Sequence, residues 1–433
     1  MTLQRLVLKN FRIVDEAIDI FGTLIVEDGL IREIAAGAAE SAADMVIDGR
    51  GFGGGAVLMP AFVDLHAHFR DPGFPEKETL ESASLAAAAG GYGTVVCMAN
   101  TKPVIDTFEK ARSLKERSDA LGLIDLYPVL SLTKNMEGRE LSGIKDLADD
   151  TGLPLMLSED GKDLADDGLF LAAMTEARRL RIPVSCHCDF GGPEAETAKA
   201  AGRLRTEWSR LEENNAVRRA IELGKRAGCH LHIAHVSTIE AAALIREVKK
   251  SPQADPCFAL SCEVTPHHIA ATKEDADRMG TPGRVNPPLR SEADRKALIA
   301  AVYDGVIDAI ATDHAPHSGT DKAAGAPGFI GLETAFAACF STLDVNLRRL
   351  SALMSANPAR ILGLDKGRRG RGRITPGLRA DLVIADTEAV QKIQPEQFKS
   401  RGKSSPFTGR ELRGKILMTL RGGLVTFEGE NGV

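Results

Sequence analysis

The sequence lacks any apolar run of the roughly 18 or more residues that a membrane-spanning helix needs, so no membrane span is expected. Its first residues, MTLQRLVLKNFRIVDEAI, carry charges throughout and lack the apolar segment of a signal peptide. A cytoplasmic location is the expectation that follows.

The chain also lacks a lysine- and arginine-rich run of the strength that favours nucleic-acid binding. It has 54 Lys and Arg against 60 Asp and Glu, for a formal net charge of -6, so no nucleic-acid partner is expected. Hydrophobic residues make up 43% of the chain, which is ordinary for a globular protein. Its 433 residues are enough for a large core and more than one domain.

Disulfides are also not expected. The seven cysteines are an odd number, and six lie in or beside apolar runs: Cys97, Cys186, Cys188, Cys229, Cys257 and Cys262. This pattern favours buried, reduced thiols. Cys186 and Cys188 flank His187 in SCHCD, but no second thiolate pair accompanies them, which argues against a thiolate metal site.

Both chain ends read as short strands joined by turns, and the middle does not. Residues 1–55 and 367–433 are therefore predicted to form one small β-sandwich domain. Residues 56–366 alternate apolar runs with amphipathic helical stretches, such as 80–91, 211–228 and 292–305. Eight such runs predict an α/β fold, a (β/α)8 TIM-type barrel. A doubly wound sheet is the alternative, but no G-x-G-x-x-G follows the early strands.

Polar or ionisable residues end six of the eight apolar runs. They are His66 with His68, then Asn100, Asp160, His187, His235 and Asp313. The carboxyl ends of barrel strands meet at one mouth, where active sites lie. Residues two apart on a strand share a face, so His66 and His68 would point together. Histidines satisfied in the core are the alternative, but their recurrence at this one place favours a site.

The chemistry of this set is that of a metal centre. Four imidazoles and two carboxylates suit one or two divalent cations, zinc above all, although cobalt or manganese would fit the same groups. A single zinc ion would need fewer ligands, so six predict two ions that share a bridge. A G-x-S-x-G nucleophile motif is missing, so acyl-enzyme catalysis has no support.

These motifs resemble the amidohydrolase superfamily and, within it, the class I bacterial dihydroorotases, over nearly the whole chain. The motifs that carry the resemblance are DLHAHFRDPG (64–73), VVCMANTKPVID (95–106), VNPPLR (285–290), TDHAPH (312–317) and GLET (331–334). The resemblance implies that His66, His68 and Asp313 bind a first zinc ion and that His187 and His235 bind a second. Asp160 would bridge them where many members carry a carboxylated lysine, with Lys162 as the less favoured alternative.

The resemblance also implies the substrate, dihydroorotate, and the product of its reversible hydrolysis, N-carbamoyl-aspartate, in pyrimidine biosynthesis. Arg70, Asn100 and His317 would bind the substrate carboxylate, Asn286 would contact the ring, and the backbone at Pro327 and Gly328 would complete the site. A guanidinium suits a carboxylate because it binds in a bidentate fork. Asp313 would act as the catalytic base and acid. A homodimer is expected, and association with aspartate transcarbamoylase is possible.

Two rival functions remain open. A hydantoinase or allantoinase would share the barrel and metal centre, but its substrate would leave Arg70 without a carboxylate. A non-catalytic scaffold for aspartate transcarbamoylase would be expected to have lost ligands, and all six are present here. Three segments depart from the family pattern: Ala61 before the first strand, Asp189 and Phe190 after His187, and the loop 317–331, which is expected to be a mobile lid.

Overall fold

A computed structural model of the chain describes residues 4–37, 43–147, 152–190, 192–203, 205–251, 255–367 and 370–429. Each of the eight predicted apolar runs contains one strand. The strands are β6 (Phe62–Ala67), β7 (Tyr92–Cys97), β8 (Asp125–Pro128), β9 (Leu157–Ser158), β10 (Val184–Cys186), β11 (His230–Ile233), β12 (Ala259–Val264) and β13 (Ala309–Ile310).

The strands close into a barrel. β6, β7 and β8 form one parallel sheet, and β9 to β13 form another in sequence order. Single parallel bridges join the two sheets, Leu130 with Leu157 on one side and Ala67 with His314 on the other. The predicted barrel is confirmed.

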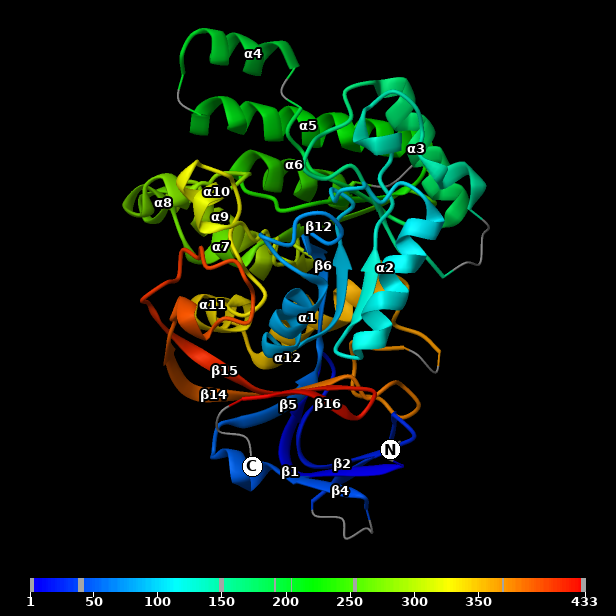
Figure 1. Ribbon diagram of the computed structural model, residues 1–433, viewed down its shortest axis with the longest axis vertical. Helices are drawn as coiled ribbons and strands as arrows, with labels where there is room; N and C mark the ends of the chain where they lie inside the picture. The colour runs from blue at the N-terminus through cyan, green and yellow to red at the C-terminus, as the bar shows by residue number, and fades with distance from the viewer. Residues whose placement is uncertain are drawn as a thin grey trace.

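Helices follow most of the strands and cover the barrel (Figure 1). They are α1 (Leu80–Ala89), α2 (Phe108–Leu121), α3 (Asp167–Leu180), α4 (Gly192–Ala200), α5 (Arg205–Ala227), α6 (Ile239–Lys250), α7 (Pro266–Ala270), α8 (Lys273–Met279), α9 (Glu292–Tyr303), α10 (Gly319–Ala323), α11 (Ala335–Thr342), α12 (Leu347–Ser351) and α13 (Asn357–Ile361). Local chemistry sets their bounds: the Thr79 side chain caps α1 by accepting from the Ser82 amide, and Gly90 ends it.

The chain ends build a second sheet, which lies below the barrel in Figure 1. Its strands are β1 (Arg5–Val14), β2 (Asp19–Glu27), β3 (Leu30–Ala36), β4 (Met45–Asp48), β5 (Ala56–Pro60), β14 (Leu382–Lys392), β15 (Glu411–Arg421) and β16 (Leu424–Glu428). β5 pairs with β1 and with β14, so this sheet continues beyond residue 55, where the predicted first segment ended.

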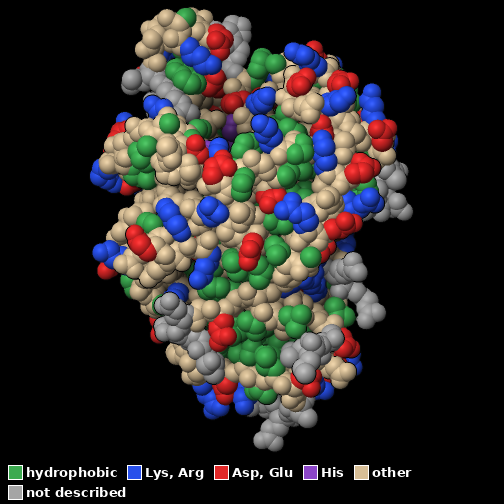
Figure 2. Space-filling view, viewed as in Figure 1, with side chains coloured by type: hydrophobic (Ala, Val, Ile, Leu, Met, Phe, Trp, Pro, Cys, Tyr) green, Lys and Arg blue, Asp and Glu red, His purple; other side chains and the backbone are tan. Residues whose placement is uncertain are grey.

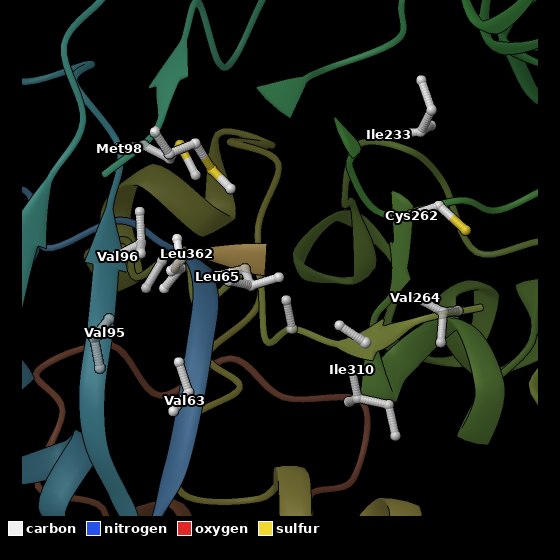
Figure 3. Packing of buried hydrophobic residues seen from close by; sticks show 14 of the residues in the cluster. Val63, Leu65, Val95, Val96, Met98, Ile233, Cys262, Val264, Ile310 and Leu362 are labelled. Carbon is white, nitrogen blue, oxygen red and sulfur yellow. The ribbon is translucent and has the colours of Figure 1, made fainter. Parts of the chain in front are cut away.

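Strand alternation separates the two cores. On β5, Val57 and Met59 pack into the barrel core, while Leu58 packs into a second core with residues from both chain ends. On β6, Val63 and Leu65 are buried on the face away from Asp64 and His66; Figure 3 shows them near β7 side chains. The barrel strands are therefore apolar toward the helices, which leaves their other face free for polar groups.

A buried ion cluster ties the barrel to the carboxyl-terminal segment. Asp125, at the start of β8, accepts hydrogen bonds from Arg371, Arg379 and Arg421. Asp125 and Arg371 are 3% exposed. Arg371 lies in the most basic stretch of the sequence, but its guanidinium is buried and pairs with Asp125. On the face shown in Figure 2, charges of both signs are interspersed.

The cysteine prediction needs one correction. All seven cysteines are free, and six of them are buried. Cys257 is exposed; it lies in the turn before β12, where its amide donates to the Asp255 side chain. Among the described helices, none combines the length and hydropathy needed to cross a bilayer.

Candidate metal centre and substrate pocket

The polar residues that follow the barrel strands converge at one end of the barrel. Asp160 lies at their centre, with Oδ1 at 3.2 Å from both His66 Nε2 and His187 Nδ1. The same oxygen is 3.8 Å from His235 Nε2, and Oδ2 is 3.4 Å from His68 Nε2. One carboxylate thus approaches all four imidazoles, which is the position that a bridging ligand needs.

Asp313 closes the cluster from the strand beside β6. Its Oδ1 lies 3.2 Å from His68 Nε2 and 3.6 Å from His66 Nε2. None of the six predicted ligands is more than 6% exposed. Two triads among them have ligand atoms within 4.8 Å of one another: His66, His68 and Asp313, and His66, Asp160 and His235. The first triad coincides with the predicted first metal site.

Two atoms of this cluster fit a metal in particular. His66 Nε2 and Asp160 Oδ1 are buried, and neither has a hydrogen-bond partner with proper geometry among the described residues. Such orphaned polar atoms are costly in a protein interior. A divalent cation would satisfy both, and imidazole with carboxylate is a donor set that zinc accepts.

The pKa shifts of the candidate ligands also fit a site for a cation. Burial alone would lower the pKa of His66, but Asp160 and Glu263 raise it well above the usual value. Burial would raise the pKa of Asp160, but His66 and His187 lower it far below its usual range. Burial and then Arg70 lower the pKa of His68. The site therefore concentrates carboxylate charge that a bound cation would balance.

Three residues of the cluster and the adjoining loop have a strained backbone. His235, Asp313 and Arg70 have φ of 33°, 45° and 57°, in the left-handed region that residues other than glycine rarely adopt. Such conformations cost on the order of 1–3 kcal/mol each and cluster at functional sites. Asp64 helps to hold them, because it accepts a 2.9 Å hydrogen bond from the amide of Thr312, next to Asp313.

The residues predicted to bind substrate line a single pocket of about 210 Å³ beside the cluster. They are Arg70, Asn100, Asn286, His317, Pro327 and Gly328, and the ligands His68, Asp160, His187 and Asp313 line it as well. A pocket of this size suits a small, single-ring molecule. The long spacings in sequence are bridged by the barrel, which brings all the strand ends to one mouth.

Arg70 supplies the positive charge of this pocket. Its Nε donates to the Pro316 carbonyl at 3.2 Å, and Nη2 lies 3.3 Å from His317 Nε2. Burial lowers the pKa of Arg70 to about 10, so it remains a cation at neutral pH. Burial and then Arg70 lower the pKa of His317 to about 3, so His317 is neutral. The pocket therefore offers one partly buried guanidinium to an anionic group.

The loop after Asp313 covers the pocket and contains α10. The buried ammonium of Lys322 donates to the carbonyls of Arg284, Ala326 and Gly328, at 2.9, 2.9 and 2.7 Å. The Gly328 amide in turn donates to the Arg284 carbonyl at 3.0 Å. These bonds hold the backbone at Gly328 against the pocket.

Known proteins match both the sequence and the fold. The model of the amidohydrolase family matches residues 57–425. A dihydroorotase from Clostridium botulinum (strain Eklund 17B / Type B) is 38% identical over 98% of this chain and 99% of that protein. A dihydroorotase from Syntrophus aciditrophicus (strain SB) is 35% identical, with the same coverage.

The chain belongs to the amidohydrolase family. A solved amidohydrolase-type structure, the L-hydantoinase (dihydropyrimidinase) from Arthrobacter aurescens, superimposes with a TM-score of 0.85 at 26% identity, covering 98% of this chain and 96% of that chain. The dihydropyrimidinase from Brevibacillus agri, at 20% identity and a TM-score of 0.82, shares the fold. The family is metal-dependent, which agrees with the candidate metal groups described above, and the family together with the dihydroorotase relatives indicates a hydrolase that acts on a cyclic amide.

Two predicted substrate residues of this amidohydrolase contact predicted metal ligands. Asn100 Oδ1 lies 3.0 Å from His68 Nδ1, and Asn286 Nδ2 lies 3.1 Å from His187 Nε2. Lys162 points elsewhere, since its Nζ donates to the Met136 carbonyl at 2.8 Å. Asp160 is therefore the group in the bridging position.

The sequence prediction missed Glu263 and left the surroundings of His187 open. Glu263, on β12, is fully buried and its Oε1 lies 3.0 Å from His66 Nδ1. Asp189 Oδ2 lies 3.4 Å from His187 Nε2. A signal for Glu263 was present, because Ser261 and Glu263 place polar groups two apart within a strand that reads as buried.

Proposed function

We propose that this chain catalyses the reversible hydrolysis of the cyclic amide of dihydroorotate to N-carbamoyl-aspartate, the dihydroorotase reaction. The observation that carries the proposal is the partly buried guanidinium of Arg70 in a small pocket that the candidate metal ligands also line. Dihydroorotate is a ring amide with a carboxylate, so it needs one cationic anchor beside one hydrolytic centre. The relatives named dihydroorotase, at 35–38% identity, favour the same reaction.

The metal part of the proposal is two zinc ions per chain. His66, His68 and Asp313 would hold the first, His187 and His235 the second, and Asp160 would bridge them. Bound zinc would supply a Lewis acid toward the amide carbonyl and would lower the pKa of water to near neutrality. Asn100 and Asn286 contact His68 and His187, so we assign them a second role in orienting these two ligands.

The remaining chemistry belongs to the side chains of the pocket. Arg70 binds the substrate carboxylate, and its position on a strained turn directs the guanidinium into the pocket. His317 is neutral and contacts the Pro327 carbonyl at 3.0 Å, so it contributes a neutral hydrogen-bonding group beside Arg70. The backbone at Pro327 and Gly328 lines the pocket beside His317 and limits the size of the ring.

Asp313 is the proposed catalytic base and acid. Burial opposes its charge, but His68 and His66 hold the pKa of Asp313 well below its usual range, so it is an ionised carboxylate at neutral pH. It takes a proton from the attacking water and delivers it to the ring nitrogen as the amide C–N bond breaks. Ring closure follows the same steps in reverse.

A hydantoinase is the second candidate, because solved hydantoinases share this fold. Its substrates have no carboxylate for Arg70. Purified protein loaded with zinc should therefore turn over L-dihydroorotate faster than hydantoin or allantoin, measured as loss of ring absorbance. Turnover of hydantoin alone would overturn the substrate assignment.

Inactivity toward every ring amide, with zinc bound, would favour a scaffold for aspartate transcarbamoylase. A homodimer, binding to that enzyme and a cytoplasmic location stay predictions.

A further inference from the structure

A chain of hydrogen-bonded side chains runs through the barrel interior from the metal centre. It begins at His66 on β6, passes to Glu263 on β12 and then to His232 on β11. Ser261, on β12, lies 2.8 Å from His232 Nδ1 and 2.8 Å from His230 Nε2. His230 is the first residue of β11, so the chain reaches the amino-terminal end of the barrel strands.

Strand geometry explains why these side chains meet. β11 and β12 are parallel neighbours with His232 opposite Ser261. Alternation places His230 and His232 on one face of β11, and Ser261 and Glu263 on one face of β12. β6 and β12 both flank β13 and are not neighbours, so His66 and Glu263 meet across the barrel interior. The chain is therefore a column of polar groups inside the barrel.

Glu263 sets the direction of the hydrogen bonds in this column. Its carboxylate is 0% exposed and faces His66 Nδ1 at 3.0 Å, His232 Nε2 at 3.0 Å and the backbone amide of His235 at 3.4 Å. A carboxylate only accepts, so both imidazoles donate to it. A His66 ring that binds a cation through Nε2 then carries its proton on Nδ1, and Nε2 is the orphaned atom that faces Asp160.

We propose that Glu263 is a positioning residue for His66, which fixes the ring orientation and the Nδ1–H tautomer that a metal ligand needs. The inference rests on the metal centre proposed above and assigns it a further residue. His232 and Ser261 hold Glu263 in place: the Ser261 hydroxyl donates to His232 Nδ1, and His230 Nε2 donates to Ser261. Groups that orient ligands in this way typically contribute 10- to 100-fold in metal affinity.

The variant Glu263→Gln tests this assignment with little change of volume. His66 and His232 face different oxygens of Glu263, and a glutamine replaces one of these oxygens with an NH₂ donor, which cannot accept from the ring that faces it. One of the two rings must change its tautomer or lose its bond. We expect zinc affinity, measured by competition with a chromophoric chelator, to fall roughly 10- to 100-fold. In the zinc-loaded protein, ¹⁵N shifts of labelled histidine should report the change of tautomer.

Asp294→Asn is the matched control. Asp294 is a fully buried carboxylate that bonds Arg210 and Ser291 at the start of α9, away from the metal centre. Its variant should bind zinc like wild type. Glu263→Gln with wild-type zinc affinity and unchanged histidine shifts would overturn the proposal, because a purely structural carboxylate would behave in that way.

Ser261→Ala keeps the test decisive if Glu263→Gln does not fold. It removes the hydroxyl that bonds His232 and His230 and leaves Glu263 in place, so we expect a smaller loss of zinc affinity, of up to about tenfold, and a moved His232 resonance. Unchanged affinity with an unmoved resonance would contradict the proposal. Wild-type protein that binds no zinc would instead overturn the metal centre itself, so the two failures are distinguishable.

Discussion

Lys322 donates a 2.7 Å hydrogen bond to the carbonyl of Gly328, and this bond joins a buried ammonium to the wall of the candidate substrate pocket. The same ammonium also bonds the carbonyls of Arg284 and Ala326. Burial lowers the pKa of Lys322 to about 8, so it is still mostly protonated at pH 7. One side chain thus joins the loop backbone at Ala326 and Gly328 to the backbone at Arg284.

Replacing Lys322 with methionine should loosen this loop. Loss of the ammonium leaves buried carbonyls without a donor, at a cost of about 1–3 kcal/mol each. We expect KM for dihydroorotate to rise about tenfold or more with a smaller change in kcat, since substrate binding needs the ordered wall. Steady-state kinetics would measure this. Lys403→Met is the control, because the Lys403 ammonium bonds two carbonyls in an exposed segment. Equal KM values for Lys322→Met and wild type would refute the role.

Arg70→Lys should weaken substrate binding although it keeps the charge. A lysine cannot reproduce the bidentate fork, and a hydrogen bond to a charged group contributes about 1.5–3 kcal/mol. The expected result is a fall in kcat/KM of roughly 10- to 100-fold. Arg112→Lys, on the exposed face of α2, should leave kcat/KM unchanged. If Arg70→Lys matched wild type, Arg70 would not bind the carboxylate.

Asp313→Asn should remove the proposed proton carrier. The amide keeps an oxygen in the same place but accepts no proton, so kcat should fall by about 10²–10⁴-fold. The zinc content of the variant, measured by emission spectroscopy, separates loss of the base from loss of metal. Asp277→Asn, on exposed α8, serves as the control. Substantial turnover by zinc-replete Asp313→Asn would assign the proton transfer to another group.

Acid should weaken the contact between the barrel and the carboxyl-terminal segment. Burial would raise the pKa of Asp125, but Arg371, Arg379 and Arg421 hold it well below the usual range. A carboxyl with a depressed pKa stabilises the fold above its unfolded pKa of about 3.9, and this stabilisation is lost as pH falls toward the folded value.

Asp125→Asn should therefore lower the free energy of unfolding by about 3–5 kcal/mol at pH 7, because buried arginines lose their partner. The difference between the free energies of unfolding of the variant and of wild type should become smaller below about pH 4, where the Asp125 carboxyl begins to be protonated in the unfolded chain. Urea unfolding at both pH values would measure it. The exposed pair of Asp304 with Arg246 provides the control Asp304→Asn, which should cost less than about 1 kcal/mol. A difference that did not vary with pH would argue against the ion cluster.

The barrel and the gathering of ligands could be predicted from the sequence because both follow from local pattern. Each apolar run is a strand, and parallel strands bring their carboxyl ends to one mouth. His66, Asp160 and Asp313 could therefore be assigned to one site although they are far apart in the chain. Every residue predicted to bind substrate also lies at this mouth.

Contacts between particular partners were not predictable in this way. The bonds of His66 to Glu263 and of His68 to Asn100 join positions 197 and 32 residues apart, and no local spacing specifies which strand faces which across the barrel. The pairing of β5 with β14 was also not visible in the sequence, because β5 is apolar on both faces and reads like a barrel strand. Its alternating packing into two cores becomes visible only once both layers are assembled.

The most direct test of the account is the rate at which zinc-loaded wild-type protein opens L-dihydroorotate, compared with Arg70→Ala and with the substrates hydantoin and allantoin. The account predicts turnover of dihydroorotate that depends on added zinc, falls at least about 10-fold in Arg70→Ala and exceeds turnover of either carboxylate-free ring. Turnover of hydantoin or allantoin without turnover of dihydroorotate would contradict it, because Arg70 would then face no substrate carboxylate.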